Sequence, residues 1–230
     1  HLKERRKACM STIEAVIFDL DGVITDTAEY HYLAWKQLGE ELGIPFDREF
    51  NETLKGVSRT ESLERILTLG GKQNDFTPEE KEELAQKKNE HYVELIQHIS
   101  SDDLLPGIVS FLDEIKEAGL KIGMASASKN AFAVVDALGV RHYFDHIVDA
   151  ATVAQSKPHP EVFLKAASAL GVKPELAIGV EDAAAGVTAI KAANMFAVAV
   201  GEESMLGHAD LIVASTDELS LERILERVHV

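Results

Sequence analysis

The chain has 230 residues, a hydrophobic content of 46% and a charged content of 27%, values typical of a globular protein with a substantial core. Its 23 Lys and Arg residues face 39 Asp and Glu residues, and the net charge of −16 argues against nucleic acid or an anionic membrane as a partner. No apolar run approaches the roughly 18–20 residues of a transmembrane helix, and the single cysteine, Cys9, suits a reducing cytoplasm. Residues 1–12 are expected to form a disordered leader.

The first predicted element is Ala15–Phe18, a short apolar run typical of a strand buried on both faces of a parallel sheet. Two acids, Asp19 and Asp21, follow this strand, and Gly22 allows the backbone to turn. Carboxylates at the end of a buried strand are costly unless they are paired, hydrogen-bonded or bound to a cation. Open α/β sheets build their sites at such strand ends. The pair therefore indicates a Mg²⁺ site with a nucleophile, although Asp-x-Asp-Gly alone is also compatible with an ordinary turn.

The next stretch has a helical pattern and a high density of charge. Helices are predicted over residues 27–42, 48–54, 60–69 and 77–99. The spacing of Asp26 and Glu29 predicts a capping box for the first helix, and Thr77 with Pro78 marks the start of the last. The other predicted strands all come after this stretch. We therefore expect an all-helical cap, residues 27–103, inserted after the Asp19/Asp21 turn and covering the site as a lid.

From residue 104 onward, helices and strands alternate, which predicts a parallel sheet with right-handed crossovers. Strands are predicted over residues 120–125, 146–148, 176–180, 196–200 and 211–213. Helices are predicted over residues 106–118, 160–170, 182–194 and 218–228, with a further one ending at residue 138. The predicted fold is α/β, with a doubly wound, Rossmann-like parallel sheet formed by residues 13–26 and 104–230 and the helical cap inserted in it.

Polar side chains follow four of the predicted strands: Asp19 with Asp21, Ser126, the Ser156-Lys157-Pro158 turn, and Glu181 with Asp182. A carboxylate can attack phosphorus, a divalent cation held by oxygens offsets the repulsion, and a hydroxyl and an ammonium can hold the other phosphoryl oxygens. Each residue also has an ordinary explanation: Ser126 as a loop serine, Lys157 as a solvated lysine, and the last two acids as a helix cap. Their occurrence in this order favours phosphoryl transfer.

The motifs Phe18-Asp-Leu-Asp-Gly-Val, Ser126, Lys157 and Gly179-Val-Glu-Asp together resemble the four motifs of the haloacid dehalogenase superfamily of phosphotransferases. The resemblance extends from Glu14 to the end of the chain. It implies that Asp19 is the nucleophile, that Asp21 is the general acid and base, and that Ser126 and Lys157 bind the phosphoryl group. It also implies a Mg²⁺ ion held by Asp19, the backbone carbonyl of Asp21 and Asp182, with Glu181 in or next to the coordination shell.

Four further segments are similar to the β-phosphoglucomutase family: Asp21–Trp35, Leu54–Arg59, Lys88-Asn89 and Ala125–Asn130. Members of that family interconvert β-glucose 1-phosphate and glucose 6-phosphate through a bisphosphate intermediate. Thr27, His31 and Trp35 fall at i, i+4 and i+8 and share one helix face, for which ordinary packing is the alternative explanation. The resemblance gives His31 a hydrogen bond that helps to place Asp21.

A mutase must also hold a second phosphate. By resemblance the candidates are Arg59 from the cap and Ser128, Lys129 and Asn130 from the core, because a guanidinium grips phosphate with two bonds and an ammonium supplies a point charge. The resemblance places four more cap residues near the sugar: Lys55, Gly56, Lys88 and Asn89. Three positions depart from the expected pattern, which leaves details of metal affinity open: His159, Glu161 and Ala183.

Two other functions stay open at this point. A sugar-phosphate phosphatase would use the same nucleophile and metal site. A phosphoacceptor signalling domain would also combine Asp, Ser and Lys on a doubly wound sheet, although it needs neither Asp21 nor a lid. We expect the protein to be a cytoplasmic monomer that acts on small sugar phosphates and has no nucleic acid or membrane partner.

Overall fold

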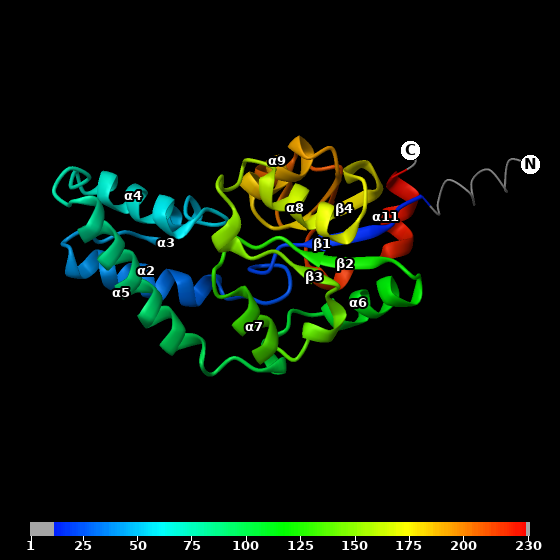
Figure 1. Ribbon diagram of the computed structural model, residues 1–230, viewed down its shortest axis with the longest axis horizontal. Helices are drawn as coiled ribbons and strands as arrows, with labels where there is room; N and C mark the ends of the chain where they lie inside the picture. Colours follow the sequence, from blue (N-terminus) through cyan, green and yellow to red (C-terminus); the bar gives the residue numbers. More distant parts are fainter. Residues whose placement is uncertain (1–11, 229–230) are drawn as a thin grey trace, which may run out of the picture.

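The computed structural model describes residues 12–228, which form a six-stranded parallel sheet with a helical insert at one end (Figure 1). The strands are β1 (Ala15–Phe18), β2 (Lys121–Met124), β3 (His146–Ile147), β4 (Ala177–Glu181), β5 (Phe196–Val200) and β6 (Leu211–Val213). Their spatial order is β3-β2-β1-β4-β5-β6, so the winding reverses next to β1. The predicted fold class is confirmed. The expectation for residues 1–12 lies outside the described residues, apart from Thr12.

Helices cover both faces of the sheet: α6 (Ile108–Glu117), α7 (Ala131–Ala137), α8 (Glu161–Leu170), α9 (Ala184–Ala192), α10 (Glu203–Leu206) and α11 (Leu221–Val228). Successive side chains of β1 enter two different apolar clusters, because side chains alternate along a strand. Val16 and Phe18 pack with α6, α7 and α11, whereas Ala15 and Ile17 pack with α8, α9 and α10. All four side chains are wholly buried, so β1 holds the residue that follows it, Asp19, at a rigid edge.

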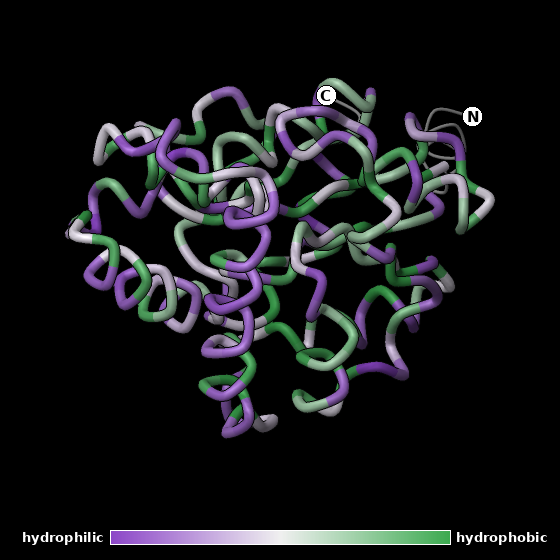
Figure 2. Tube along the Cα trace, turned by 60° about the vertical axis from the view of Figure 1, so that its left-hand side comes forward, coloured by the Kyte–Doolittle hydropathy of each residue, from purple (hydrophilic) through white to green (hydrophobic). Residues whose placement is uncertain are grey.

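The helical insert contains α2 (Ala28–Glu41), α3 (Arg48–Glu52), α4 (Arg59–Leu69) and α5 (Pro78–Ile96). Hydrophobic and hydrophilic residues alternate along these helices, as Figure 2 shows, and the apolar faces form a cluster that includes Trp35, Leu38 and Ile66. The predicted start of α5 is confirmed, since Thr77 and Glu80 form a reciprocal capping box. No helix among residues 12–228 combines the length and hydropathy needed to cross a membrane.

The two connections between the insert and the sheet run side by side. The Thr25 hydroxyl donates to the Asp103 carbonyl at 2.6 Å, and the Leu105 N–H donates to the Ile24 carbonyl at 2.9 Å. The insert therefore leaves and rejoins the sheet at one place, directly beyond the turn that carries Asp19 and Asp21. The boundaries of a separate cap domain at residues 27 and 103 stay a prediction.

Two local predictions in the insert are wrong. The helix α2 begins after Thr27 without a side-chain cap, and Glu29 instead accepts two hydrogen bonds from Arg48, at 2.7 and 2.9 Å. This bidentate ion pair takes the carboxylate that a capping box would need. The helix α5 ends at Ile96, three residues earlier than expected.

Candidate active site

The register of the central strands brings distant parts of the chain to one edge of the sheet. Phe18 at the end of β1 lies opposite Met124 of β2 and Val180 of β4. The residues that follow these positions, Asp19 and Glu181 among them, therefore meet at the carboxyl edge. The Asp19 N–H donates to the Val180 carbonyl at 3.0 Å, which extends the ladder by one step and fixes the backbone of Asp19.

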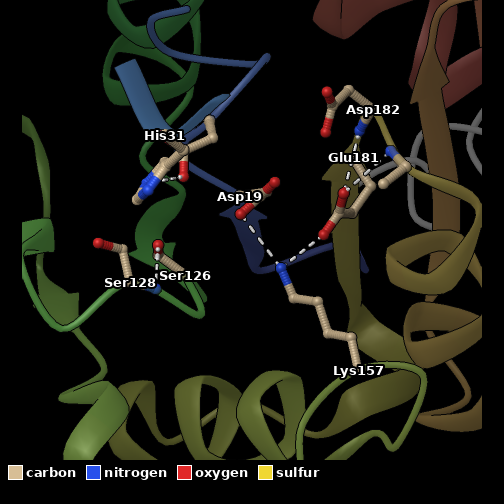
Figure 3. Close-up of polar contacts among 9 residues, drawn as sticks. Asp19, His31, Ser126, Ser128, Lys157, Glu181 and Asp182 are labelled. Carbon is tan, nitrogen blue, oxygen red and sulfur yellow. Dashed lines mark hydrogen bonds and ion pairs between the residues drawn. The ribbon is translucent and has the colours of Figure 1, made fainter. Parts of the chain in front are cut away.

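Lys157 lies between two of these acids, as Figure 3 shows. Its ammonium is 3.1 Å from Asp19 Oδ1 and 2.6 Å from Glu181 Oε1, and all three side chains are buried. Burial opposes the positive charge, but Asp19 and Glu181 outweigh it and raise the pKa of Lys157 above its ordinary value. The expectation that Lys157 directly follows a strand is wrong. It lies in a loop ten residues past the end of β3 at Ile147, beyond a short turn over Ala150–Thr152.

Asp19, Glu181 and Asp182 form a group that could hold a metal ion, since one oxygen of each lies within 4.8 Å of the others. Burial, followed by the repulsion of Glu181, raises the pKa of Asp19 and raises that of Asp182 to about 8. The cluster thus places three carboxyl groups around one buried ammonium, and burial makes their ionised forms costly without a further cation. A hard divalent cation, which prefers carboxylate oxygens, is chemically suited to this set. Both oxygens of Glu181 are engaged, one by Lys157 and the other by the N–H groups of Asp182 and Ala183.

Two glycines leave room for these carboxylates. Gly22 has a φ of +78°, and a Cβ there would lie 1.9 Å from Asp182 Oδ2. A Cβ on Gly186 would lie 1.9 Å from Glu181 Cδ. The sequence predicts only a turn at Gly22 and gives no signal at Gly186, because the close approach depends on how α9 packs on β4.

Asp21 connects the acidic cluster to the insert. His31 Nε2 lies 3.5 Å from Asp21 Oδ2, and His31 Nδ1 lies 2.8 Å from the ammonium of Lys88. When Lys88 is protonated its ammonium only donates, so Nδ1 is then the acceptor and the proton of the neutral ring is on the Nε2 that faces Asp21. Burial and Lys88 lower the pKa of His31, which favours this neutral ring. The other oxygen of Asp21 is buried and accepts no hydrogen bond from the described residues.

The surroundings of Lys88 are aromatic. Its ammonium lies 4.7 Å from the centre of the Trp35 ring and 4.8 Å from that of Tyr92. Burial and the charge of Arg59 lower the pKa of Lys88 to about 7. The Tyr92 ring stacks on His31 at 3.9 Å, with 9° between the planes, and so fixes the orientation of the imidazole. Sequence reasoning missed Tyr92, although its position four residues after Lys88 on a predicted helix places both on one face.

A cavity of about 470 Å³ lies between the insert and the sheet edge. Every residue predicted for the site lines it except Thr27 and Glu181, which are wholly buried behind its wall. Two of the lining residues close the gap between insert and core: the Asn130 side-chain amide donates to Asn89 Oδ1 at 2.7 Å. The loop that carries Asn130 is ordered by serines, because Ser126 Oγ accepts from the Ser128 N–H and Ser128 Oγ from the Asn130 N–H, both at 3.1 Å.

Comparison with known proteins gives the family of this chain. The sequence profile of the haloacid dehalogenase-like hydrolases matches residues 13–194. This chain is a haloacid dehalogenase-like hydrolase. The resemblance seen in the sequence is therefore confirmed, and the match spans the insert as well as the strands β1 to β4.

Three relatives place this haloacid dehalogenase-like hydrolase more finely. It is 52% identical to the β-phosphoglucomutase of Bacillus subtilis, over 93% of this chain and 95% of that protein. The crystal structure of a β-phosphoglucomutase from Clostridium difficile matches with a TM-score of 0.93 and 53% identity, over 94% of this chain and 97% of that one. The fructose-1-phosphate phosphatase YqaB of Escherichia coli is 34% identical, over 80% of this chain and 95% of that protein.

Proposed function

We propose that this protein is a Mg²⁺-dependent β-phosphoglucomutase, which interconverts β-D-glucose 1-phosphate and glucose 6-phosphate through glucose 1,6-bisphosphate. The observation that carries the proposal is that one cavity is lined both by Asp19 with Lys157 and by further cations, among them Arg59 from the insert and Lys129 from the core. A substrate with a single phosphate needs only Asp19 and Lys157, whereas a bisphosphate also needs cations that bind its second phosphate. The identity of 52% to a β-phosphoglucomutase supports the same substrates.

The metal ion would be held by Asp19, Asp182 and the backbone carbonyl of Asp21, with Glu181 beside it. The support for this assignment is the set of three carboxyl groups around one buried ammonium and the space that Gly22 leaves beside Asp182. When bound, Mg²⁺ supplies positive charge that offsets the repulsion between the carboxylates and a phosphoryl group.

Asp19 is the nucleophile. One of its oxygens is held by Lys157, and the other attacks phosphorus while the bond from phosphorus to the departing oxygen breaks, which gives an aspartyl phosphate. Lys157 and the Ser126 hydroxyl bind the phosphoryl oxygens during this transfer. Burial keeps these groups out of water, where their electrostatic effect would be weaker.

Asp21 moves the proton. When the 6-hydroxyl of β-glucose 1-phosphate attacks the phosphorylated Asp19, Asp21 accepts the proton of that hydroxyl. The bisphosphate then presents its 1-phosphoryl group to Asp19, and Asp21 returns the proton to the departing O1, which releases glucose 6-phosphate and restores the phosphoenzyme. The Nε2 proton of His31, fixed by Lys88 and by stacking on Tyr92, orients the Asp21 carboxylate.

The remaining lining residues hold the rest of the substrate. Arg59, Ser128, Lys129 and Asn130 bind the phosphate that does not react, and the guanidinium of Arg59 is suited to a two-bond grip. Thr27 is buried behind the wall of the cavity and supports it. The sugar is enclosed by other residues of the insert: Trp35, Lys55, Gly56, Lys88 and Asn89. The insert, residues 27–103, acts as a lid that excludes water during transfer.

The test follows β-glucose 1-phosphate, glucose 6-phosphate and inorganic phosphate together, with and without Mg²⁺ and with a trace of glucose 1,6-bisphosphate as primer. A mutase converts the first sugar phosphate into the second, needs Mg²⁺, and releases little inorganic phosphate. The variant Asp19→Asn should be inactive, and Arg59→Ala should lose isomerisation. Release of inorganic phosphate from both sugar phosphates, without isomerisation, would contradict the proposal.

The second candidate function is a sugar-phosphate phosphatase with the same Asp19 nucleophile. The 34% identity to a fructose-1-phosphate phosphatase is the observation that favours it. In that case Arg59→Ala would leave the release of inorganic phosphate largely intact, because no second phosphate has to be held.

We also propose that the enzyme acts as a monomer in the cytoplasm. One copy of the chain supplies both the nucleophile and the cations that the proposed reaction uses, so the reaction requires no partner subunit. Light scattering at the concentration of the assay checks this proposal, and a dimer with higher specific activity than the monomer would contradict it.

A further inference from the structure

The loop that carries Lys157 has little secondary structure of its own. It runs from the turn at Ala150–Thr152 to the start of α8, and a hydrogen bond from the His159 N–H to the Ser156 carbonyl spans Lys157 at 3.0 Å. The Lys157 ammonium nevertheless has to lie between two carboxylates, 3.1 Å from one and 2.6 Å from the other. Some other part of the molecule must therefore hold this loop in place.

Glu161, the first residue of α8, provides such an attachment. Its Oε2 accepts the N–H of Ala154 at 2.7 Å and its Oε1 accepts the N–H of Gln155 at 3.2 Å. Each carboxylate oxygen thus binds one backbone amide of the two residues that precede Ser156 and Lys157. The hydrogen bond from the Ala154 N–H lowers the pKa of Glu161, so the carboxylate is ionised near neutral pH.

The helix that bears Glu161 is well suited to be a fixed reference. Its apolar face is buried in the cluster that also contains Ala15 and Ile17 of β1, the strand that ends at Asp19. One turn further along, Lys165 donates to the Thr152 carbonyl and lies 3.5 Å from Glu161 Oε2. The Phe163 ring, wholly buried on the same helix, lies 5.3 Å from the Lys157 ammonium. A shift of the loop relative to α8 would therefore move this ammonium relative to Asp19.

We propose that Glu161 is a positioning residue for phosphoryl transfer, which acts by tying the Lys157 loop to the rigid start of α8. This inference rests on the proposed function, because it takes Lys157 as the cation that binds the phosphoryl group. The competing explanation is that Glu161 only stabilises the helix, since an acid in the first turn interacts favourably with the helix dipole.

The experiment compares Glu161→Gln with the matched control Glu222→Gln. Glu222 is an exposed first-turn acid of α11, on the far side of the sheet from the insert (Figure 1). Glu161→Gln should lower kcat by about tenfold, because small displacements of a catalytic group are costly, while the KM for the sugar phosphate changes by less than about twofold. The control should leave both constants unchanged. An unchanged kcat for Glu161→Gln would overturn the proposal.

A double-mutant cycle shows whether the effect acts through Lys157. In a Lys157→Ala background, the added Glu161→Gln substitution should change the residual turnover by less than about twofold, since coupled residues are not additive. An equal loss in both backgrounds would mean that Glu161 acts elsewhere. If Lys157→Ala does not fold, Lys157→Arg replaces it in the cycle, with the same two outcomes.

Hydrogen exchange gives a readout that does not depend on turnover. In the substrate-free protein, the amides of Ala154 and Gln155 should exchange at least about tenfold faster in Glu161→Gln than in the unaltered protein. Unchanged exchange would refute the attachment itself. The same kinetic comparison is also made by measuring the release of inorganic phosphate. If the protein proves to be a phosphatase, the mutase assignment is wrong, but the effect of Glu161→Gln on phosphate release still tests the role of Glu161.

Discussion

Replacing Lys157 with methionine should destabilise the protein in a pH-dependent way. Methionine has a similar length and no charge, so the change removes the ammonium from between Asp19 and Glu181 and leaves both carboxylates buried. Near pH 7, a buried carboxylate without a cation is expected to take up a proton. Keeping one more carboxyl group of the cluster protonated at pH 7 than in the unaltered protein costs, against an ordinary carboxyl pKa of about 4.3, about 1.4 kcal/mol per unit, or about 4 kcal/mol of folding free energy.

The sign of the pH dependence follows from the raised pKa. The folded variant binds a proton that the unfolded chain releases, so the penalty grows as the pH rises from about 4 to 7. Near pH 5 the same protonation costs only about 1 kcal/mol. The value near neutral pH agrees with the loss of about 3–5 kcal/mol that follows when one partner of a buried ion pair is removed.

Urea unfolding in the presence of EDTA, at pH 5 and pH 7, measures this difference. The control is Lys191→Met, which removes an exposed ammonium 2.7 Å from Asp210 and should cost less than about 1 kcal/mol at both pH values. An equal loss for Lys157→Met at the two pH values would mean that packing, not charge, is responsible. A loss below about 1 kcal/mol at pH 7 would mean that other groups already compensate the two carboxylates.

Three further predictions address the metal, the lid and the stability of the insert. Because burial and Glu181 raise the pKa of Asp182 to about 8, Mg²⁺ must displace a proton from this carboxyl group below that pH. The apparent Kd for Mg²⁺, measured by calorimetry, should therefore fall by up to roughly tenfold per pH unit between pH 6 and 8 and then level off. A Kd that does not change with pH would contradict the raised pKa. Asn89→Ala removes the hydrogen bond from Asn130 that links the insert to the core. Losing about 1 kcal/mol of the free energy of closure should raise KM about fivefold in steady-state assays. An unchanged KM would exclude a role of this hydrogen bond in closure. Thr77→Ala breaks the capping box of α5 and should cost about 1 kcal/mol in thermal unfolding with kcat unaltered; a change in kcat would show that the cap reaches the site.

The sequence by itself determined the local elements and the kinds of side chain in the site. The run of buried residues before Asp19 marks β1 because a strand covered on both faces must be apolar throughout. The Thr77-Pro78 pair marks the start of α5, because a hydroxyl caps free N–H groups and proline needs no donor there. The motif order around Asp19 and Asp182 was enough to indicate the family.

The tertiary structure alone decided which groups face one another. Lys157 lies 138 positions from Asp19 in the chain, and its contacts with Asp19 and Glu181 depend on the strand order and on a loop that no local pattern predicts. The stacking of Tyr92 on His31 and the attachment of Ala154 and Gln155 to Glu161 likewise arise only after helices pack on the sheet and on each other. Local propensity acts over a few residues, whereas these contacts are fixed by the burial of apolar faces far apart in the chain.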